Sequence, residues 1–308
     1  MNAEPTPRCA WCGALARPSG ARLAVCDTCG TATTYPAPDD AELRSAYGGS
    51  YRPPSGRFSG PGDWVLRHTR ALLAGRLDRQ APPGPILDVG SGEGALLAAL
   101  GSTGRVAVGL EQGDQAVHAR LDVREVEIVD FDEHSGTWAA VVFWHSLEHL
   151  REPRAALRRA RELLAPSGLL VIAIPNRASW QARYLGDRWL ALDLPRHLVH
   201  LPAGALLEGV RESGLTVERV SYWRGGQVLF GWLDGLVSML PTQPSLYDAI
   251  RQTDARATAI SGSRRTLTLG AGAVLSPVAT VLAAGEVAAG AGGSVYVEAR
   301  RPSSDERR

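Results

Sequence analysis

Residues 86–100 read ILDVGSGEGALLAAL, and this stretch decides the fold that we predict for the chain. The apolar run at residues 86–89 is typical of a buried strand. Three closely set glycines follow, at Gly90, Gly92 and Gly94, and then a leucine- and alanine-rich run that is typical of a helix. Strand, glycine turn and helix make a unit that binds nucleotide-like ligands at the carboxyl edge of a parallel sheet. Glycine tolerates positive φ and lets the backbone approach the ligand.

Acids follow at the ends of the next two predicted strands. Residues 105–111 read RVAVGLE and form the expected second strand, with Glu111 at its tip. A carboxylate there can accept both hydroxyls of a ribose; the alternative is a solvated position at a helix cap. Residues 126–130 form the expected third strand, with Asp130 placed to meet an adenine amino group.

The remaining core elements are predicted from apolar periodicity. Amphipathic helices are expected over residues 64–77, 154–164 and 203–213. Further strands are expected over 139–144, 169–174, 215–223 and 293–300, the last of them antiparallel at the sheet edge. This alternation predicts an α/β fold, in which helices cover both faces of a mostly parallel sheet.

The motifs and their order resemble the class I S-adenosylmethionine (SAM)-dependent methyltransferases. The likeness is carried by Asp88-x-Gly90-x-Gly92-x-Gly94, by WHSLEHL at residues 144–150 and by LLVIAIPN at 169–176. It covers residues 85–223, and PRHLVHL at 195–201 is similar to the ubiquinone-biosynthesis-like, or methyltransferase-23-like, group. The resemblance implies a Rossmann-like, seven-stranded sheet in the order 3-2-1-4-5-7-6 and SAM as cofactor.

The resemblance also implies where SAM would bind. The carboxylate of Asp88 suits a ligand that carries a cationic sulfonium, and Glu111 suits its ribose. The implied cofactor-binding set is Asp88, Gly90, Ser91, Gly92, Gly94, Glu111, Gln112, Asp130, Phe131, His145 and His149.

Histidines follow both the fourth and the fifth predicted strand, so they converge on one edge of the sheet. Methyl transfer to a hydroxyl or an acidic carbon needs an aligned nucleophile and a general base. We favour His197 as that base and place His145 second. In the similar sugar C-methyltransferases that carry an amino-terminal zinc module, a histidine at the position of His197 faces the substrate. Each histidine has a packed or surface position as its alternative.

The predicted substrate-binding set combines aromatic residues and histidines. Tyr47 and Tyr51 belong to the segment that covers the SAM pocket in related methyltransferases; the alternative is that they pack the cysteine-bearing segment onto the core. His197 and His200 complete the set. The acceptor is expected to be an oxygen or carbon nucleophile of a small lipid-like, glycosyl or polyketide-type metabolite.

All four cysteines lie near the amino terminus, as the pairs Cys9-x-x-Cys12 and Cys26-x-x-Cys29. Two such pairs suit one tetrahedral zinc with a closed shell, which would be structural and take no part in chemistry. The alternative is two disulfides or unpaired thiols, and a reducing compartment disfavours disulfides. An RNA methyltransferase that grips RNA through this segment is the second function considered. Residues 1–35 hold no basic patch, which makes nucleic acid an unlikely partner.

These observations divide the chain into a zinc-ribbon-like module (1–35), a linker with lid helices (36–84) and a methyltransferase domain (85–308). An apolar helical insertion occupies 224–292. Within it, residues 267–289 approach the length of a membrane span, but glycines, a proline and a carboxylate weaken that interpretation. The insertion either packs on the core as a helical hairpin or touches a membrane or lipid-like substrate.

Composition narrows the function further. A formal net charge of +1 excludes a global electrostatic attraction to nucleic acid or to an anionic membrane. Residues 1–30 contain no apolar leader. We therefore expect a cytoplasmic protein, in contact with a membrane at most at its periphery.

Overall fold

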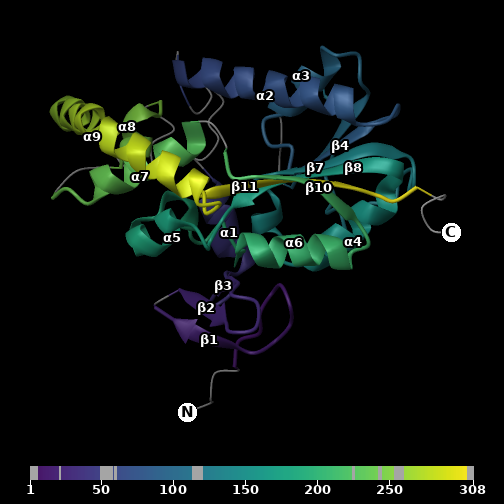
Figure 1. Cartoon of the computed structure of the whole chain (residues 1–308), viewed down its shortest axis with the longest axis horizontal. Helices are drawn as coiled ribbons and strands as arrows, with labels where there is room; N and C mark the ends of the chain where they lie inside the picture. Colours follow the sequence, from purple (N-terminus) through teal and green to yellow (C-terminus); the bar gives the residue numbers. More distant parts are fainter. Residues whose placement is uncertain are drawn as a thin grey trace.

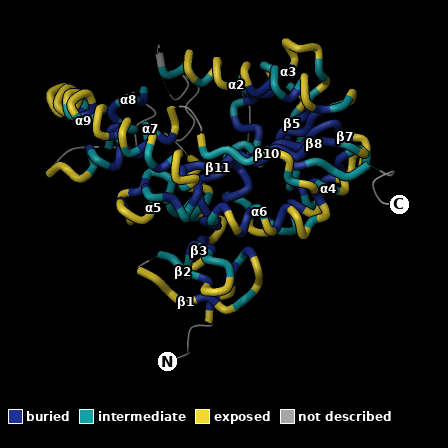
Figure 2. The backbone as a smooth tube through the Cα atoms, in the orientation of Figure 1, coloured by how far each residue is buried: buried dark blue, intermediate teal, exposed yellow. Residues whose placement is uncertain are grey.

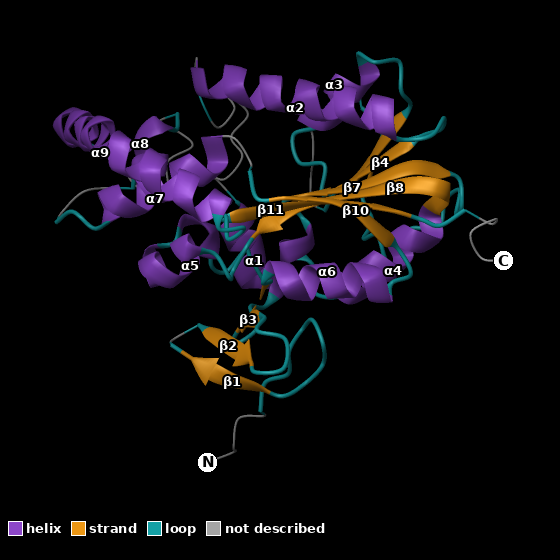
Figure 3. Cartoon of the chain, in the orientation of Figure 1, coloured by secondary structure: helices purple, strands orange, loops and turns teal. Residues whose placement is uncertain are grey.

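The computed structural model describes residues 6–20, 22–48, 58, 61–112, 121–223, 226–241, 245–252 and 260–303. A seven-stranded sheet lies at its centre, with helices on both faces (Figures 1 and 3). Its strands are β4 (Ile86–Val89), β5 (Ala107–Leu110), β6 (Val123–Arg124), β7 (Trp138–Trp144), β8 (Leu164–Pro175), β10 (Thr216–Ser221) and β11 (Ser294–Arg300). They lie in the order β10-β11-β8-β7-β4-β5-β6. This is the predicted order read from the opposite edge, so the predicted fold class is confirmed.

Six strands of this sheet run in the same direction, and β11 alone runs opposite to them. β4 pairs in parallel with both β5 and β7, and the parallel pairing extends to β6 and β8. β11 is antiparallel, as expected, but its predicted edge position is wrong, because it lies between β8 and β10. Burial explains why β11 is internal and β10 is the edge strand: six of the seven residues of β11 are buried, whereas no residue of β10 is.

The third strand lies earlier in the chain than predicted. β6 pairs with β5 through Val123 and Arg124, whereas the prediction placed the strand at 126–130. That segment is a turn, in which the Asp130 N–H donates to the Glu127 carbonyl at 3.1 Å. Ile128 is 1% exposed and anchors the turn in the core. The apolar side chains of this turn point into the core and give the same sequence pattern as a strand, so the pattern alone did not distinguish the two.

The central strands are buried on both faces, which explains their uninterrupted apolar sequences. Along β7, Val141 and Phe143 join one core cluster, while Ala140 and Val142 join the other. Helices α2 (Pro61–Gln80) and α3 (Ala95–Gly101) cover the face that lies uppermost in Figure 1. Helices α4 (Pro153–Leu163) and α6 (Ala203–Glu212) cover the opposite face. The buried strands appear as the dark blue centre of Figure 2.

The amino-terminal segment forms a small antiparallel sheet below α6 (Figure 1). Its strands are β1 (Ala16–Ser19), β2 (Leu23–Cys26) and β3 (Ala32–Thr34), and β3 pairs with β9 (Val199–His200) from far along the chain. We call residues 6–34 the cysteine module. Trp11 docks it: the ring is 5% exposed and its Nε1 donates to the Ala205 carbonyl at 3.2 Å. Gly209 makes room, because a Cβ there would lie 2.3 Å from the Trp11 ring.

Short elements connect the module to the large sheet and extend beyond it. Helix α1 (Asp40–Tyr47) begins after Asp39, whose side chain accepts from the Glu42 N–H at 2.8 Å. Helix α5 (Trp180–Leu185) follows β8. The 3₁₀ turns are η2 (Leu147–His149), η3 (Gly186–Arg188) and η4 (Leu190–Leu192).

The apolar insertion contributes α7 (Gly226–Ser238), α8 (Leu246–Ile250) and α9 (Gly262–Ala288) beside the sheet (Figure 1). Glu286 of α9 is fully buried, and its carboxylate accepts from the Gln181 N–H at 2.8 Å and from Trp232 Nε1 at 3.0 Å. Among the described helices, α9 alone is long and apolar enough to cross a membrane, by length and composition only. Only 22% of its apolar window is buried.

Candidate functional site

The glycine loop after β4 forms the floor of the candidate site. Gly90, Gly92 and Gly94 have φ values of +74°, +58° and +71°, a region that side chains other than glycine's rarely adopt. A Cβ at Gly90 would lie 2.5 Å from the Cβ of Ser146, so this loop packs directly against the one after β7. Ser91, 9% exposed, packs under β5: a Cβ at Gly109 would lie 2.5 Å from its Oγ.

Glu111 stands just past the end of β5, where the sequence placed it. Its carboxylate accepts from the Gly92 N–H at 2.5 Å and from the Gln112 N–H at 3.2 Å. The acid is therefore tied directly to the glycine loop. The arrangement places a carboxylate beside the backbone amides that would face a ligand.

Asp88, in β4, is a buried carboxyl group at the base of this loop, only 3% exposed. Burial raises its pKa to about 7; Arg70 acts to lower that pKa, and Glu111 raises it further. The positive charge of Arg70 does not outweigh burial, so ionised Asp88 would be stabilised further by an additional positive charge. A cationic ligand would supply it, so the residues present fit a sulfonium-bearing cofactor.

Asp130, which was predicted to meet the adenine, and Phe131, its neighbour in the cofactor-binding set, lie differently from each other. Phe131 is 3% exposed and packs against the Trp138 ring in the core, with 5.8 Å between ring centroids. Asp130 is exposed in the turn described above. The acid that reaches the tip of β5 is instead Glu127, whose carboxylate accepts from the Gln112 side-chain amide. Glu127 lies three residues after β6, so a correct placement of the third strand in the sequence would have indicated this acid.

His145 directly follows β7 and has a positive φ of 55°, which is uncommon for a side-chain-bearing residue. Its Nδ1 lies 3.4 Å from Glu148 Oε1, and its Nε2 lies 3.2 Å from the amide nitrogen of Gln227. An amide nitrogen only donates, so Nε2 is the accepting nitrogen and Nδ1 carries the hydrogen that faces Glu148. The side chain remains 22% exposed.

Glu148 lies at the centre of a buried cluster with three histidines, His145, His149 and His197. It is 2% exposed. Burial raises its pKa, but the nearby histidines outweigh burial, His145 most strongly, so the net pKa is below its ordinary value. An ionised carboxylate is thereby held inside the protein at neutral pH.

His149 and His197 pack edge to face, with 4.6 Å between ring centroids. Each directs Nδ1 at a backbone carbonyl, of Arg196 at 2.9 Å and of Ala191 at 2.8 Å respectively, so each Nδ1 carries the hydrogen. Burial, together with the charge of His197, lowers the pKa of His149 to about 4. His197 Nε2 lies 3.7 Å from Asp193 Oδ2 and 4.0 Å from Glu148 Oε1.

The predicted substrate residues do not all meet. The Tyr47 hydroxyl lies 2.9 Å from His149 Nδ1 and so joins the histidine cluster. His200 is 4% exposed in β9, where burial lowers its pKa to about 3, and it faces the cysteine module. Tyr51 lies outside the described residues.

A cavity of about 270 Å³ lies beside the His197 segment. It is lined by Ser45, Ala46, Gly48, Leu190, Asp193, Arg196, Ser245, Tyr247, Asp248 and Arg251. The glycine loop does not border it, so this space is separate from the expected cofactor position. Asp193 and Arg196 line this cavity and also approach the histidine cluster, through His197 Nε2 and His149 Nδ1 respectively.

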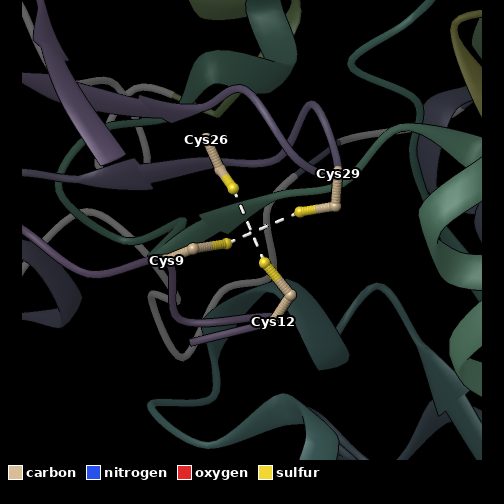
Figure 4. A group of neighbouring side chains, drawn as sticks. All are labelled: Cys9, Cys12, Cys26 and Cys29. Atoms are coloured by element: carbon tan, nitrogen blue, oxygen red, sulfur yellow. Dashed lines mark hydrogen bonds between the residues drawn. The ribbon is translucent and has the colours of Figure 1, made fainter. Parts of the chain in front are cut away.

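The four cysteines converge in one place, with their sulfurs directed toward one another (Figure 4). Cys9 Sγ lies 3.6 Å from Cys29 Sγ, and Cys12 Sγ lies 3.5 Å from Cys26 Sγ. All four cysteines are free thiols, so the disulfide alternative has no support. A tetrahedral zinc with bonds of about 2.3 Å would place its sulfurs about 3.8 Å apart, which the residues present fit.

Comparisons with known proteins agree with this geometry. Residues 65–220 match the model of a family described as a methyltransferase domain. A ubiquinone biosynthesis O-methyltransferase of Erwinia tasmaniensis is 26% identical over 147 residues, 44% of this chain and 57% of that protein. One of Xanthomonas campestris pv. campestris (strain B100) is 32% identical over 156 residues, covering 45% and 65% respectively. The chain thus spans less than two thirds of these two curated relatives.

Among solved structures, a SAM-dependent methyltransferase of Archaeoglobus fulgidus aligns with a TM-score of 0.48 and 14% identity. The alignment covers 77% of this chain and 98% of that one.

Replacing Asp88 with Asn should change how stability depends on pH. The folded-state pKa of about 7 lies above the ordinary value of 3.8. The stability that protonated Asp88 contributes is therefore present below about pH 4 and is lost as the pH rises through 7. Asp88→Asn removes this loss, so the unfolding free energy of the variant relative to wild type should rise between pH 4 and 7, by a few kcal/mol at most. Urea unfolding at each pH measures the difference, and a difference independent of pH would contradict the assignment.

Proposed function

Because this chain belongs to the methyltransferase-domain family, we propose that it transfers the methyl group of SAM to a small-molecule acceptor. The observation that carries the proposal is the buried Asp88 carboxyl beneath three left-handed glycines, with Glu111 bonded to the same loop. The cradle combines backbone amides, a carboxylate for a ribose and a buried acid that favours a cation. The carboxylate suits the ribose of SAM, and the buried acid suits its cationic sulfonium.

SAM supplies the electrophilic methyl group when it is bound, and the protein aligns and activates the nucleophile. Asp88, the glycine loop and Glu111 would hold SAM, with Ser91, Gln112 and Glu127 around them. The tight packing of Gly90 on Ser146 keeps His145 beside this loop. The base and the methyl donor would then meet at the carboxyl ends of β4 and β7.

We propose His145 as the general base, ahead of His197, which the sequence favoured. Its accepting Nε2 is the nitrogen turned away from Glu148, and its side chain is more exposed than that of His197 (22% against 10%). Glu148 would stabilise the imidazolium that forms when Nε2 takes the acceptor proton. Gln227 occupies the position in which an acceptor hydroxyl would approach Nε2.

His197 has a supporting place in this scheme. Its Nε2 faces Asp193 and Glu148, and Asp193 in turn borders the cavity beside the cluster. Burial raises the pKa of Asp193, but His197 and Arg196 outweigh burial and keep it below its ordinary value. His197 thus lies between two carboxylates, where it would orient both Glu148 and Asp193, which lines the cavity.

The acceptor proposed is a hydroxylated small metabolite. Support comes from the O-methyltransferase names of the curated relatives and from a base suited to deprotonating a hydroxyl. A carbon nucleophile of a lipid-like, glycosyl or polyketide-type compound needs the same base. The RNA alternative gains no support, because Arg17 and Arg22 of the cysteine module are paired with Asp27 and Glu42.

We propose that the cysteine module holds one structural zinc. Four sulfurs form a closed shell, and backbone N–H groups of Cys29 and Thr28 help lower the pKa of Cys26 to about 7 although burial raises it. A closed shell leaves no position for water or substrate, so the ion would stabilise the fold only. In a module this small it would supply much of the folding energy.

We also propose that α9 contacts the surface of an anionic membrane. Leu267, Val274, Val278 and Val281 are each at least half exposed, and the one carboxylate of the helix, Glu286, is buried. The remaining charges of α9 are Arg264 and Arg265 in its first turn. An exposed apolar face with basic residues at one end suits an interfacial helix on anionic lipid.

Replacing His145 with Asn should lower turnover by about 10²–10⁴-fold, because a positioned base is lost. The assay follows S-adenosylhomocysteine release with an acceptor found by screening small hydroxylated compounds. Calorimetry should give a SAM affinity within a few-fold of wild type. His134→Asn, at an exposed histidine outside the site, is the control.

Two outcomes would count against this scheme. Turnover of the His145→Asn variant within a few-fold of wild type would remove the base from His145. Failure of the folded wild-type protein to bind either SAM or S-adenosylhomocysteine would overturn the proposed function itself.

Metal analysis of the purified protein should find one zinc per chain. Cys12→Ser should lower the zinc content and the melting temperature, since one ligand of the closed shell is missing. Less than half a zinc per chain, with all four thiols intact, would disprove the zinc assignment.

Vesicles that contain anionic phospholipid should bind the protein, and Val274→Asp with Val281→Asp should weaken this binding by about tenfold or more, because two carboxylates enter the apolar face. Val106→Asp is the matched control, since Val106 is an equally apolar residue that is 67% exposed and lies outside α9, directly before β5. Sedimentation with vesicles measures the binding. Equal binding by both variants, or a dimer that α9 forms without lipid, would contradict the proposal.

A further inference from the structure

The cysteine module makes backbone contact with the loop that carries His197. β3 pairs antiparallel with β9 through Ala32 with His200 and Thr33 with Val199. The Thr34 N–H extends the pairing, donating to the Leu198 carbonyl at 2.9 Å. A module at one end of the chain therefore supplies the neighbouring strand for a loop about 165 residues away.

Leu198 joins the module to the histidine cluster through a single residue. Its N–H donates to the backbone carbonyl of Glu148 at 2.9 Å, while its carbonyl accepts from the Thr34 N–H at 2.9 Å. One side of this residue thus holds the turn that bears Glu148, and the other holds the module. A shift of β3 would be transmitted directly to Glu148 and His197.

The Thr34 side chain adds a second connection. It is 2% exposed, and its hydroxyl donates to the His197 carbonyl at 2.6 Å. Because the only hydroxyl hydrogen is used there, the contact with His200 Nε2 at 3.4 Å requires that nitrogen to donate. One buried hydroxyl therefore bonds the backbone of one histidine and faces the ring of another.

The cysteine cluster and these contacts belong to one short segment. The Gly30 N–H donates to the Cys26 carbonyl at 2.9 Å, and the Gly30 carbonyl accepts from Arg177 Nη1 at 3.1 Å. Cys29 Sγ lies 3.2 Å from Thr31 Oγ1, and β3 begins at the next residue. Ordering the cysteines would therefore order β3.

We propose that the cysteine module serves as a positioning element for the active site, with Thr34 as the residue that sets His197 and Glu148. This inference rests on the proposed function, since it gives the module a role in the same site. The module would act through the β3–β9 pairing and Leu198 and would not touch SAM or the acceptor. Loss of metal order in the module would then disturb His197 while the glycine loop stays intact.

Thr34→Val, which keeps the shape and removes the hydroxyl, tests the proposal in the full-length protein. We expect a kcat about tenfold lower, as for a lost buried hydrogen bond, with the KM for SAM unchanged within about twofold. Amide hydrogen exchange at Leu198 and His200 should become faster, while exchange within β4 and β7 stays as in wild type. Thr34→Ser, which restores the hydroxyl, should recover both properties.

Thr33→Val is the matched control, because Thr33 lies on the same strand and its hydroxyl accepts from the Ala10 N–H within the module. It should leave exchange at Leu198 unchanged. Removing the metal from wild-type protein with a chelator should reproduce the faster exchange at Leu198 and His200.

The exchange data decide the proposal independently of any acceptor. Unchanged exchange and kcat in Thr34→Val, or a Thr34→Ser variant as defective as Thr34→Val, would overturn it. If wild type fails to bind SAM in calorimetry, the proposed function fails, whereas faster exchange at Leu198 in Thr34→Val would still establish the coupling.

Discussion

Burial of the central strands on both faces is the constraint on which the rest of this structure depends. Strands β4 and β7 and the second half of β8 are buried almost throughout, so their side chains are mostly apolar and their polar neighbours gather where the strands end. Asp88 is the exception inside β4, and its raised pKa records the cost of placing a carboxyl group there. The glycine loop, Glu111 and His145 all lie at the same edge of the sheet, directly after strands β4, β5 and β7.

The electrostatics of that edge divide into two neighbourhoods. Around Asp88, burial of the acid outweighs the positive charge of Arg70, which favours a cationic ligand. Around Glu148 an acid is surrounded by three histidines, which holds it ionised and gives it a way to stabilise a protonated imidazole. The contact of Gly90 with Ser146 joins the two, because Ser146 lies between His145 and Glu148 in the chain. A methyl donor beside Asp88 and a base beside Glu148 could therefore lie next to each other, each with its own carboxyl group as electrostatic partner.

The cysteine module adds a third layer to this arrangement. Trp11 fixes it to α6, and β3 completes a small sheet with β9. The segment that carries the four-cysteine cluster is thus bonded to the loop that bears two histidines. The apolar insertion on the other side of the molecule is organised by the buried Glu286, whose bonds to Gln181 and Trp232 join α9 to α5 and α7.

The amino-acid sequence by itself determined the glycine loop with Asp88 before it and each of the two cysteine pairs, because each depends on residues a few positions apart. The order of the strands was inferred from the resemblance to the methyltransferase family, since it depends on segments far apart in the chain. The sequence pattern misplaced the third strand, since Ile128 is buried from a turn and apolar spacing does not distinguish that from a strand. Only the tertiary structure decided that Glu127 rather than Asp130 reaches Gln112, that His145 turns its hydrogen-bearing Nδ1 toward Glu148 and leaves Nε2 as the acceptor, and that β3 pairs with β9. These contacts join segments that are separated in sequence, and which of them form depends on how the helices and loops pack over the sheet.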